Sequence, residues 1–239
     1  MSSEAFKQKC KNLLQRFLWF VRQWPLRLWR LILHLALFAR LLPGIGLQVH
    51  YYEFYKWRIL IWIGELFLNL LDLTGFPEIY ETIDEWIKWK TRPLIKKEND
   101  LIQEIFGQHI NTSLLLIDTK ASWFARKYKI AYVTFNTVNC HGAISDDLLI
   151  HEVTHCWQYQ RFGSVYILRA LLGQKTKAGY DPGDLSKYNN LPMGELIKKY
   201  NYEQQAEIMS EYFKTIHGLP TTYLAQKTEL ITIKEQLLS

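Results

Sequence analysis

Five consecutive residues, His151 to His155, constrain the fold of this chain more than any other feature. They read His-Glu-Val-Thr-His, so two histidines stand four positions apart and a glutamate follows the first. On an α-helix, side chains four residues apart project from one face, one turn above the other. Both imidazoles can then bind a single metal ion, with Glu152 beside it. The pattern therefore predicts a helix that carries two ligands of a zinc site.

The residues around the motif favour a helix from 146 to 162. Ser145 is a suitable N-cap residue, and two aspartates in the first turn complement the positive end of the helix dipole. Gly163 is placed to end the helix. In a catalytic zinc site Glu152 would take a proton from a water molecule whose pKa the metal lowers. Such sites usually hold zinc through three side chains, so a third ligand is expected elsewhere.

A second predicted helix, at 200–213, is the expected source of the third ligand. Residues 156–161, directly after the motif, contain no further histidine, aspartate or glutamate. Apolar residues recur at helical spacing in 200–213, and Glu203 and Glu207 flank this apolar stripe. We predict Glu203 as the metal ligand and Glu207 as the acceptor for the free ring N–H of a ligand histidine. Two alternatives stay open: Glu207 as the ligand, and a solvated acidic helix face.

The motif at 151–155, followed by Glu203 and Glu207, resembles the gluzincin branch of zinc metallopeptidases. The sequence His155-Cys156-Trp157-Gln158 is also similar to bacterial metallopeptidase domains in which Trp-Gln shortly follows the motif. This resemblance covers residues 107–218. The chain differs from thermolysin-like members in the longer stretch between the motif and the third ligand, and in a Glu where they typically have Asp.

The resemblance implies an α+β fold and a Zn²⁺-dependent metallopeptidase that hydrolyses peptide bonds in a peptide or protein substrate. We expect a zincin-like domain at 93–218, with a small mixed or antiparallel sheet and the active-site helix. An α-helical region at 1–92 precedes this domain, and a short helical tail at 219–239 follows it. The alternative from another class is a non-catalytic protein with a zinc site, which binds a membrane surface or a partner.

Zincin-like enzymes bind an extended peptide along an edge strand beside the cleft. Residues 127–138 alternate β-branched and aromatic side chains and give the strongest strand signal in the chain. A second strand is expected at 112–118. Within the first strand, the side chains predicted to lie along the substrate are Ala131, Val133 and Phe135.

The family also places a tyrosine or a histidine near the oxyanion that forms during hydrolysis. The candidates downstream of the motif are Tyr202 and His217, with Tyr180, Tyr188 and Tyr200 as further tyrosines. Nothing in the sequence ranks them, and each is also open to a purely structural role. Residues 173–194 are rich in turn formers and are expected to form a loop that borders the cleft.

Positive charge is concentrated at the start of the 239-residue chain. Residues 1–60 contain ten Lys or Arg but only Glu4 and Glu53 as acids, a net charge of +8, whereas the whole chain carries +6. Seven of the nine tryptophans lie within residues 1–92. Basic and aromatic residues together are typical of helices that lie in the interface of an anionic membrane.

Three helices are predicted in this basic region, at 13–42 with a kink or break near Pro25, at 54–72 and at 77–90. They either pack on the catalytic domain and on each other, or contact an anionic membrane surface through residues 13–72. Arginines interrupt the first apolar run, so neither a transmembrane span nor a signal peptide is expected. Nucleic acid is not an expected partner, because Leu and Ile surround the basic residues.

Cysteine usage is sparse, with Cys10, Cys140 and Cys156. An odd number without a secretory signal is typical of a reducing compartment, so we expect a cytoplasmic protein, either free or associated with a membrane. Cys140 and His141 could join the two motif histidines in a closed structural zinc site. That arrangement is disfavoured, because no second cysteine stands at the short spacing typical of such sites.

Overall fold

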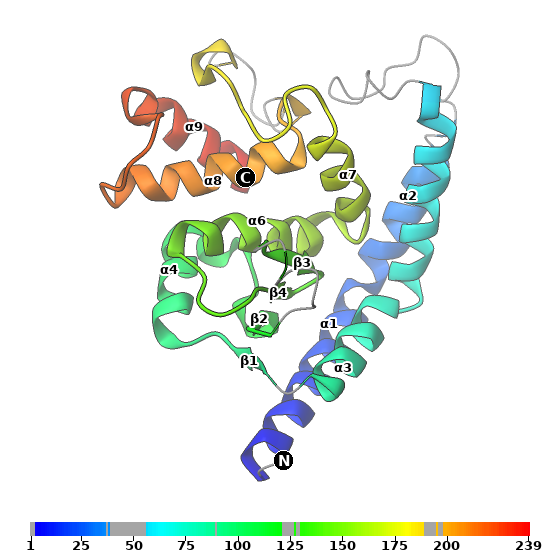
Figure 1. The fold of residues 1–239 in the computed structure, drawn as a ribbon. Coiled ribbons are helices and arrows are strands. Elements are labelled where there is room, and N and C mark those ends of the chain that lie inside the picture. Colours follow the sequence, from blue (N-terminus) through cyan, green and yellow to red (C-terminus); the bar gives the residue numbers. More distant parts are fainter. Residues whose placement is uncertain are drawn as a thin grey trace.

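The computed structural model shows an α+β protein in which helices surround one small sheet (Figure 1). It describes residues 3–36, 38, 56–88, 90–120, 127, 130–188, 195 and 198–239. The longer helices are α1 (Ser3–Ala36), α2 (Arg58–Leu73), α3 (Phe76–Ile87), α4 (Lys96–Phe106), α6 (Asp146–Phe162), α7 (Val165–Gln174), α8 (Tyr202–Ile216) and α9 (Lys227–Leu238). The strands are β1 (Thr91–Pro93), β2 (Leu116–Asp118), β3 (Tyr132–Thr134) and β4 (Thr137–Asn139). The predicted α+β class is confirmed.

Within the described residues the strands form a mixed sheet in the order β1-β2-β4-β3. The central pair, β2 and β4, is parallel, with Leu116 opposite Thr137. The outer pairs are antiparallel: Thr91 lies opposite Asp118, and Tyr132 opposite Asn139. Strand β3 is therefore an edge strand, as the sequence predicts. Strand β1 crosses the boundary predicted between residues 92 and 93.

The single strand predicted at 127–138 is instead a hairpin, and this prediction was wrong. Phe135 adopts a φ of 55° and forms a turn with Asn136 between β3 and β4. Side chains from distant elements accept the two turn N–H groups: Tyr166 Oη accepts that of Phe135, and Glu81 that of Asn136. A two-residue turn leaves the alternation of apolar residues intact, so the sequence pattern hides it. Residues 128 and 129 lie outside the described residues.

The strand predicted at 112–118 is confirmed only at its end, where β2 lies. Residues Thr112–Leu114 form a 3₁₀ turn instead. The Asn111 side chain accepts a hydrogen bond from the Ser113 N–H at 3.2 Å, which favours a turn over an extended backbone.

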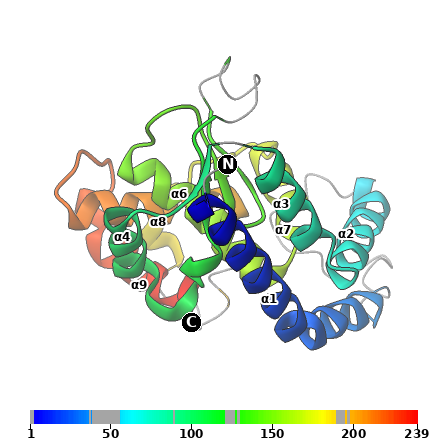
Figure 2. The same cartoon turned by 90° about the horizontal axis from the view of Figure 1, so that it is seen from below.

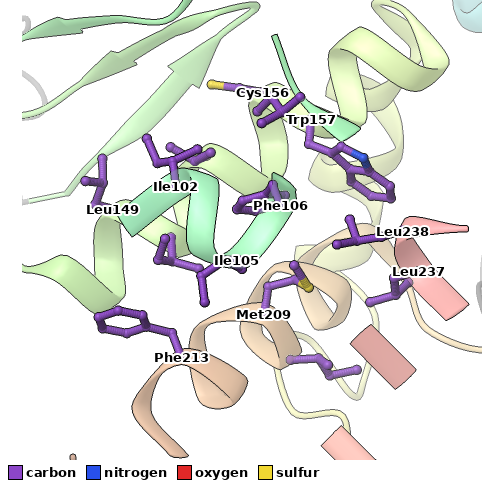
Figure 3. Packing of buried hydrophobic residues seen from close by; sticks show 14 of the residues in the cluster. Ile102, Ile105, Phe106, Leu149, Cys156, Trp157, Met209, Phe213, Leu237 and Leu238 are labelled. Carbon is purple, nitrogen blue, oxygen red and sulfur yellow. The ribbon is translucent and has the colours of Figure 1, made fainter. Parts of the chain in front are cut away.

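Helix α6 confirms the predicted bounds of 146 to 162 and lies at the centre of the molecule. The sheet covers one side of α6 and α8 covers the other, while α9 lies beyond α8 (Figure 1). The helix is consequently buried from Leu149 to Gln160. Figure 3 shows how α4, α6, α8 and α9 fill the main core, whose labelled members include Ile102, Phe106, Trp157, Met209, Phe213 and Leu237.

The first helix is longer than predicted and continues through Pro25. A proline inside a helix removes one hydrogen bond and usually bends the axis. Figure 2 shows the axis of α1 changing direction while the helix continues. Helices α2 and α3 confirm the other two predicted helices to within a few residues, and α9 confirms the helical tail. Residues 37 and 39–55, which include the predicted end of the first helix, lie outside the described residues.

Charged side chains line the inner face of α1, α2 and α3, where these helices meet each other and the sheet-bearing part. Arg16 pairs with Glu85 at 2.7 Å, and Arg27 forms a two-pronged ion pair with Glu78. All four side chains are buried. A buried charge without a partner is strongly destabilising, so these pairs fix how the helices pack.

Similar polar contacts join α2 to α7 and to the turn that follows α6, the helix that carries the His151–His155 motif. Asp72 of α2 accepts hydrogen bonds from both the N–H and the hydroxyl of Ser164, in the turn between α6 and α7. Glu65 pairs with Arg169 of α7 at 2.7 Å. The amino-terminal helices therefore pack on the rest of the molecule.

None of the helices in the described part of the chain is by itself long and apolar enough to cross a bilayer. Helices α2 and α3, which meet at an angle of 70°, pass that test of length and composition only as a pair.

Replacing Gly163 with Ala should destabilise the protein through two effects. Gly163 has a φ of 77°, and an added Cβ would collide with the Asp72 carboxylate. Gly107→Ala is the matched control, because Gly107 has a φ of 53° but no atom within 4 Å of the added Cβ. Urea unfolding should show a loss of roughly 1–3 kcal/mol for Gly107→Ala from backbone strain, and a clearly larger loss for Gly163→Ala. Equal losses would show that the Asp72–Ser164 contact is unimportant.

Candidate metal centre

Helices α6 and α8 bring His151, His155 and Glu203 together. One donor atom from each of these buried residues lies within 4.8 Å of the other two. Glu203 Oε2 is 3.5 Å from His151 Nε2 and 3.4 Å from His155 Nε2. The three predicted ligands therefore form a group that could bind a metal ion.

The cap of α8 fixes the position of Glu203. Asn201 accepts hydrogen bonds from the N–H groups of Glu203 and Gln204, each at 2.9 Å. Gln204 in turn accepts one from the Asn201 N–H. This reciprocal capping box starts the helix at Tyr202, so Glu203 lies in its first turn, facing α6.

Both histidines have an acceptor at the ring nitrogen that faces away from the group. Glu207 Oε2 lies 3.3 Å from His151 Nδ1, and Gln158 Oε1 lies 2.8 Å from His155 Nδ1. Because a carboxylate can only accept, His151 carries a proton on Nδ1, and its Nε2 faces Glu203, where a bound metal ion would take the place of a proton. Metal-binding histidines are usually held in this way, so the donor set fits a metal ion.

Two glutamines to which the sequence analysis gave no role at the site complete the surroundings. Gln158 donates to the Tyr202 carbonyl at 2.9 Å and to Gln205 at 3.0 Å, which ties α6 to α8. Gln174 donates to Glu203 Oε1 at 2.9 Å. Gln158 stands one helical turn after His155, so its contact with that histidine could have been predicted from the spacing. No local sequence pattern points to Gln174.

A pocket opens onto this group. It is lined by Glu152, by residues of β3 and α7, and by the loop after α7. Glu152 is 6% exposed, and burial raises the pKa of its carboxyl group. The pocket therefore combines the three donor residues with a carboxyl group whose environment favours holding a proton.

The electrostatics of the group are dominated by mutual attraction of histidines and carboxylates. Burial lowers the pKa of His151, but Glu203 and Glu207 outweigh this effect and raise it to about 9. Burial acts to raise the pKa of Glu203, yet hydrogen bonds from the two histidines bring it to about 2. In the absence of a cation the carboxylates thus hold a proton on His151, at the place where a metal ion would supply the positive charge.

The predicted substrate strand is placed beside the pocket only in part. Ala131 and Val133 line it, together with Tyr132. Phe135 lies in the hairpin turn and does not line it; its ring is 5.2 Å from that of Tyr159 in a separate small core. The turn at Phe135 breaks the strand before that residue can face the pocket.

The two named oxyanion candidates lie away from the pocket. The Tyr202 hydroxyl bonds to Arg169 at 3.1 Å, and its ring packs in the small core. His217 caps the far end of α8, 3.2 Å from Glu104. Tyr180 does line the pocket, with its ring centre 6.1 Å from that of His151.

Tyr200 and Cys140 do not join the group. Tyr200 is buried in the main core, and the side chain of Tyr188 lies outside the described residues. Cys140 is buried with its sulfur 3.6 Å from the Gly142 carbonyl. Among the described residues, the group able to hold a metal contains neither Cys140 nor His141.

No family model matches the chain, and no solved structure matches it significantly. The chain is similar to the Type VI secretion system spike protein VgrG2b of Pseudomonas aeruginosa, with 28% identity over 134 residues. The similar stretch covers 51% of this chain and 13% of the relative. The likeness thus concerns about half of this chain and a small part of the relative's length.

Replacing Gln158 with Leu should lower the affinity of this group for a divalent metal ion about 10- to 100-fold, because His155 loses the acceptor that orients its ring. Gln160→Leu is the matched control: Gln160 is buried on the same helix but bonds to Asn111 and Asn136, away from the pocket. Competition with a fluorescent chelator measures the affinity of each variant. An equal loss in both would mean that Gln158 acts only through general stability.

Proposed function

We propose that this chain is a zinc metallopeptidase with a zincin-like catalytic domain of the gluzincin type. The observation that carries the proposal is the meeting of His151 Nε2, His155 Nε2 and the Glu203 carboxylate, with Glu152 lining the same pocket. The relative's name describes a secretion spike protein and contributes nothing to this proposal.

Two imidazoles and one carboxylate form a donor set well suited to zinc. His151, His155 and Glu203 would hold the ion, with Glu207 and Gln158 orienting the two rings. When bound, zinc supplies Lewis acidity, which lowers the pKa of water and polarises a carbonyl group. Three protein donors, rather than four, match the ligand number of catalytic zinc sites.

Glu152 would act as the general base and then as the general acid. Its carboxylate takes a proton from the attacking water and passes that proton to the amine that leaves. Burial raises the pKa of this carboxyl group, which makes the carboxylate a stronger base than one in water. Both proton transfers occur at the same side chain, so no second acid is required.

An extended peptide would bind along β3. Within the described residues the outer edge of this strand pairs with no other strand. The pocket is lined by Ala131, Tyr132 and Val133. A peptide added there forms backbone hydrogen bonds that do not depend on its side chains. The site therefore favours unfolded or extended segments of a protein substrate.

Tyr180 is the group best placed to donate a hydrogen bond to the oxyanion of the tetrahedral intermediate. Burial, together with the nearby carboxylates of Glu203, Glu152 and Glu207, raises the pKa of its hydroxyl to about 12. The hydroxyl therefore keeps its proton at neutral pH and remains a donor.

Replacing Glu152 with Gln should leave zinc bound and abolish turnover. The amide preserves the shape of the side chain but cannot accept the proton of water, so we expect a loss of at least about a hundredfold in kcat. Zinc content by elemental mass spectrometry and cleavage of an unfolded protein or a quenched peptide library give the two readouts. Glu104→Gln, an exposed change on α4, is the control and should keep both. Full turnover by the Glu152 variant would contradict the proposed mechanism.

Replacing Tyr180 with Phe should lower kcat by about 10²- to 10³-fold while zinc stays bound, because one hydrogen bond to the oxyanion is lost. Tyr212→Phe is the matched control, since Tyr212 lies on α8 away from the pocket. Steady-state kinetics separate the two constants: an unchanged kcat with a raised KM would assign Tyr180 to substrate binding instead.

A further inference from the structure

Helices α2 and α3 expose an outer surface that is almost wholly apolar. The structure describes residues 58–87 throughout, and every exposed side chain among them is apolar or aromatic except Thr74. These exposed side chains include Ile59, Leu60, Ile63, Phe67, Leu70, Phe76, Ile79, Ile83, Trp86 and Ile87. The Thr74 hydroxyl is already bonded to the Leu71 carbonyl. Besides Thr74, only Tyr80 with its hydroxyl and Trp86 with its ring N–H have exposed side chains in this stretch that could hydrogen-bond to water or to a protein partner.

Helix α1 continues this surface. Between Asn12 and Ala36, all within the described part, Arg22 is the single exposed side chain that carries a charge. The other exposed side chains there include Leu13, Leu14, Phe17, Leu18, Val21, Trp24, Leu26, Trp29, Ile32, Leu33 and Leu35. Helices α1, α2 and α3 lie side by side along one flank of the molecule, and α8 and α9 lie on the other (Figures 1 and 2). We call the exposed side of α1–α3 the apolar face.

No charged side chain of α2 or α3 is exposed, and two arginines of α1 point inward. Arg16, Arg27, Glu78 and Glu85 are buried in ion pairs behind the apolar face. A layer of helices exposed to water normally has charged side chains on its outer side and apolar side chains on its inner side. Here the arrangement is the reverse. Contiguous apolar patches beyond a few hundred Å² are rare on soluble monomers, and they mark surfaces covered by lipid or protein.

We infer that the apolar face inserts into the interfacial region of a lipid bilayer, independently of the proposed catalysis. A protein interface carries about one hydrogen bond per 100–200 Å² and a polar rim, whereas lipid tails require neither. The shortage of hydrogen-bonding groups from 58 to 87 therefore favours lipid. Exposed Trp24, Trp29, Trp57 and Trp86 suit the headgroup region, where indole rings accumulate.

Charge complementarity points to an anionic surface. Among the exposed charged side chains of α1–α3, Lys7, Lys11 and Arg22 are basic and Glu4 is acidic, so the exposed charge is positive. The helices would lie in the plane of the membrane rather than cross it. The inner side of α1 and α2 is already occupied by Tyr159, Arg161, Ser164 and Arg169. The rest of the molecule then stays on the aqueous side, with α7 joining the pocket to the membrane-bound layer.

Flotation of the full-length chain with lipid vesicles tests this inference. Vesicles of phosphatidylcholine, with and without phosphatidylglycerol, should carry the protein upward, with tighter binding to the anionic mixture. The triple variant Ile63→Gln, Phe67→Gln and Ile83→Gln should lower the partition coefficient by at least about tenfold, because three inserted apolar side chains are lost. The matched control changes three exposed apolar residues outside the face: Ile95→Gln, Leu219→Gln and Leu224→Gln. It should bind as the parent does.

Circular dichroism of both triple variants verifies that they fold. A parent chain that stays unbound with both vesicle types would overturn the inference. Binding that needs anionic lipid, disappears in high salt and is unaffected by the triple variant would overturn it too, since charge alone would then explain it. A soluble oligomer that the triple variant dissociates would show that a second copy covers the face.

Discussion

The enclosure of α6 between the sheet and α8 is the constraint on which the rest of the structure depends. A helix covered on both sides cannot leave its polar groups to water, so His151, His155 and Gln158 need partners inside the protein. Helix α8 supplies them through Glu203, Glu207 and the backbone of Tyr202. The packing that builds the core is thus the same packing that assembles the donor group.

A second set of buried charges determines how the amino-terminal helices pack. Arg27 contacts Glu78, the Asp72 carbonyl and the Tyr159 hydroxyl, so it joins α1, α2, α3 and α6. Ion pairs of this kind contribute little net stability once desolvation is included. Their effect here is geometric, because the alternative packings of α1–α3 would leave charges buried without partners. The Glu65–Arg169 pair and the Asp72–Ser164 contact hold α7, and therefore one wall of the pocket, in place.

Local patterns predicted the helices and the donor residues well, because helical spacing, caps and glycine stops all act within a few residues. The bounds of the strand and the position of Tyr180 depend on distant contacts. The turn at Phe135 is held by Glu81 and Tyr166, neither of which the sequence places near it. As candidates for the group near the oxyanion, Tyr202 and Tyr180 could not be ranked from the sequence. Their positions depend on how α7 and the loop after it fold back. The paired charges behind the apolar face are equally non-local, so the basic composition of the segment did not reveal that Arg16 and Arg27 lie inside.

Zinc K-edge X-ray absorption of the zinc-loaded protein tests the central claim most directly. The account predicts a first shell of nitrogen and oxygen alone, at about 2.0–2.1 Å, with outer-shell scattering from two imidazole rings. Sulfur at about 2.3 Å would bring in a cysteine and contradict the His151, His155 and Glu203 site. Failure of the folded protein to retain any zinc would contradict it as well.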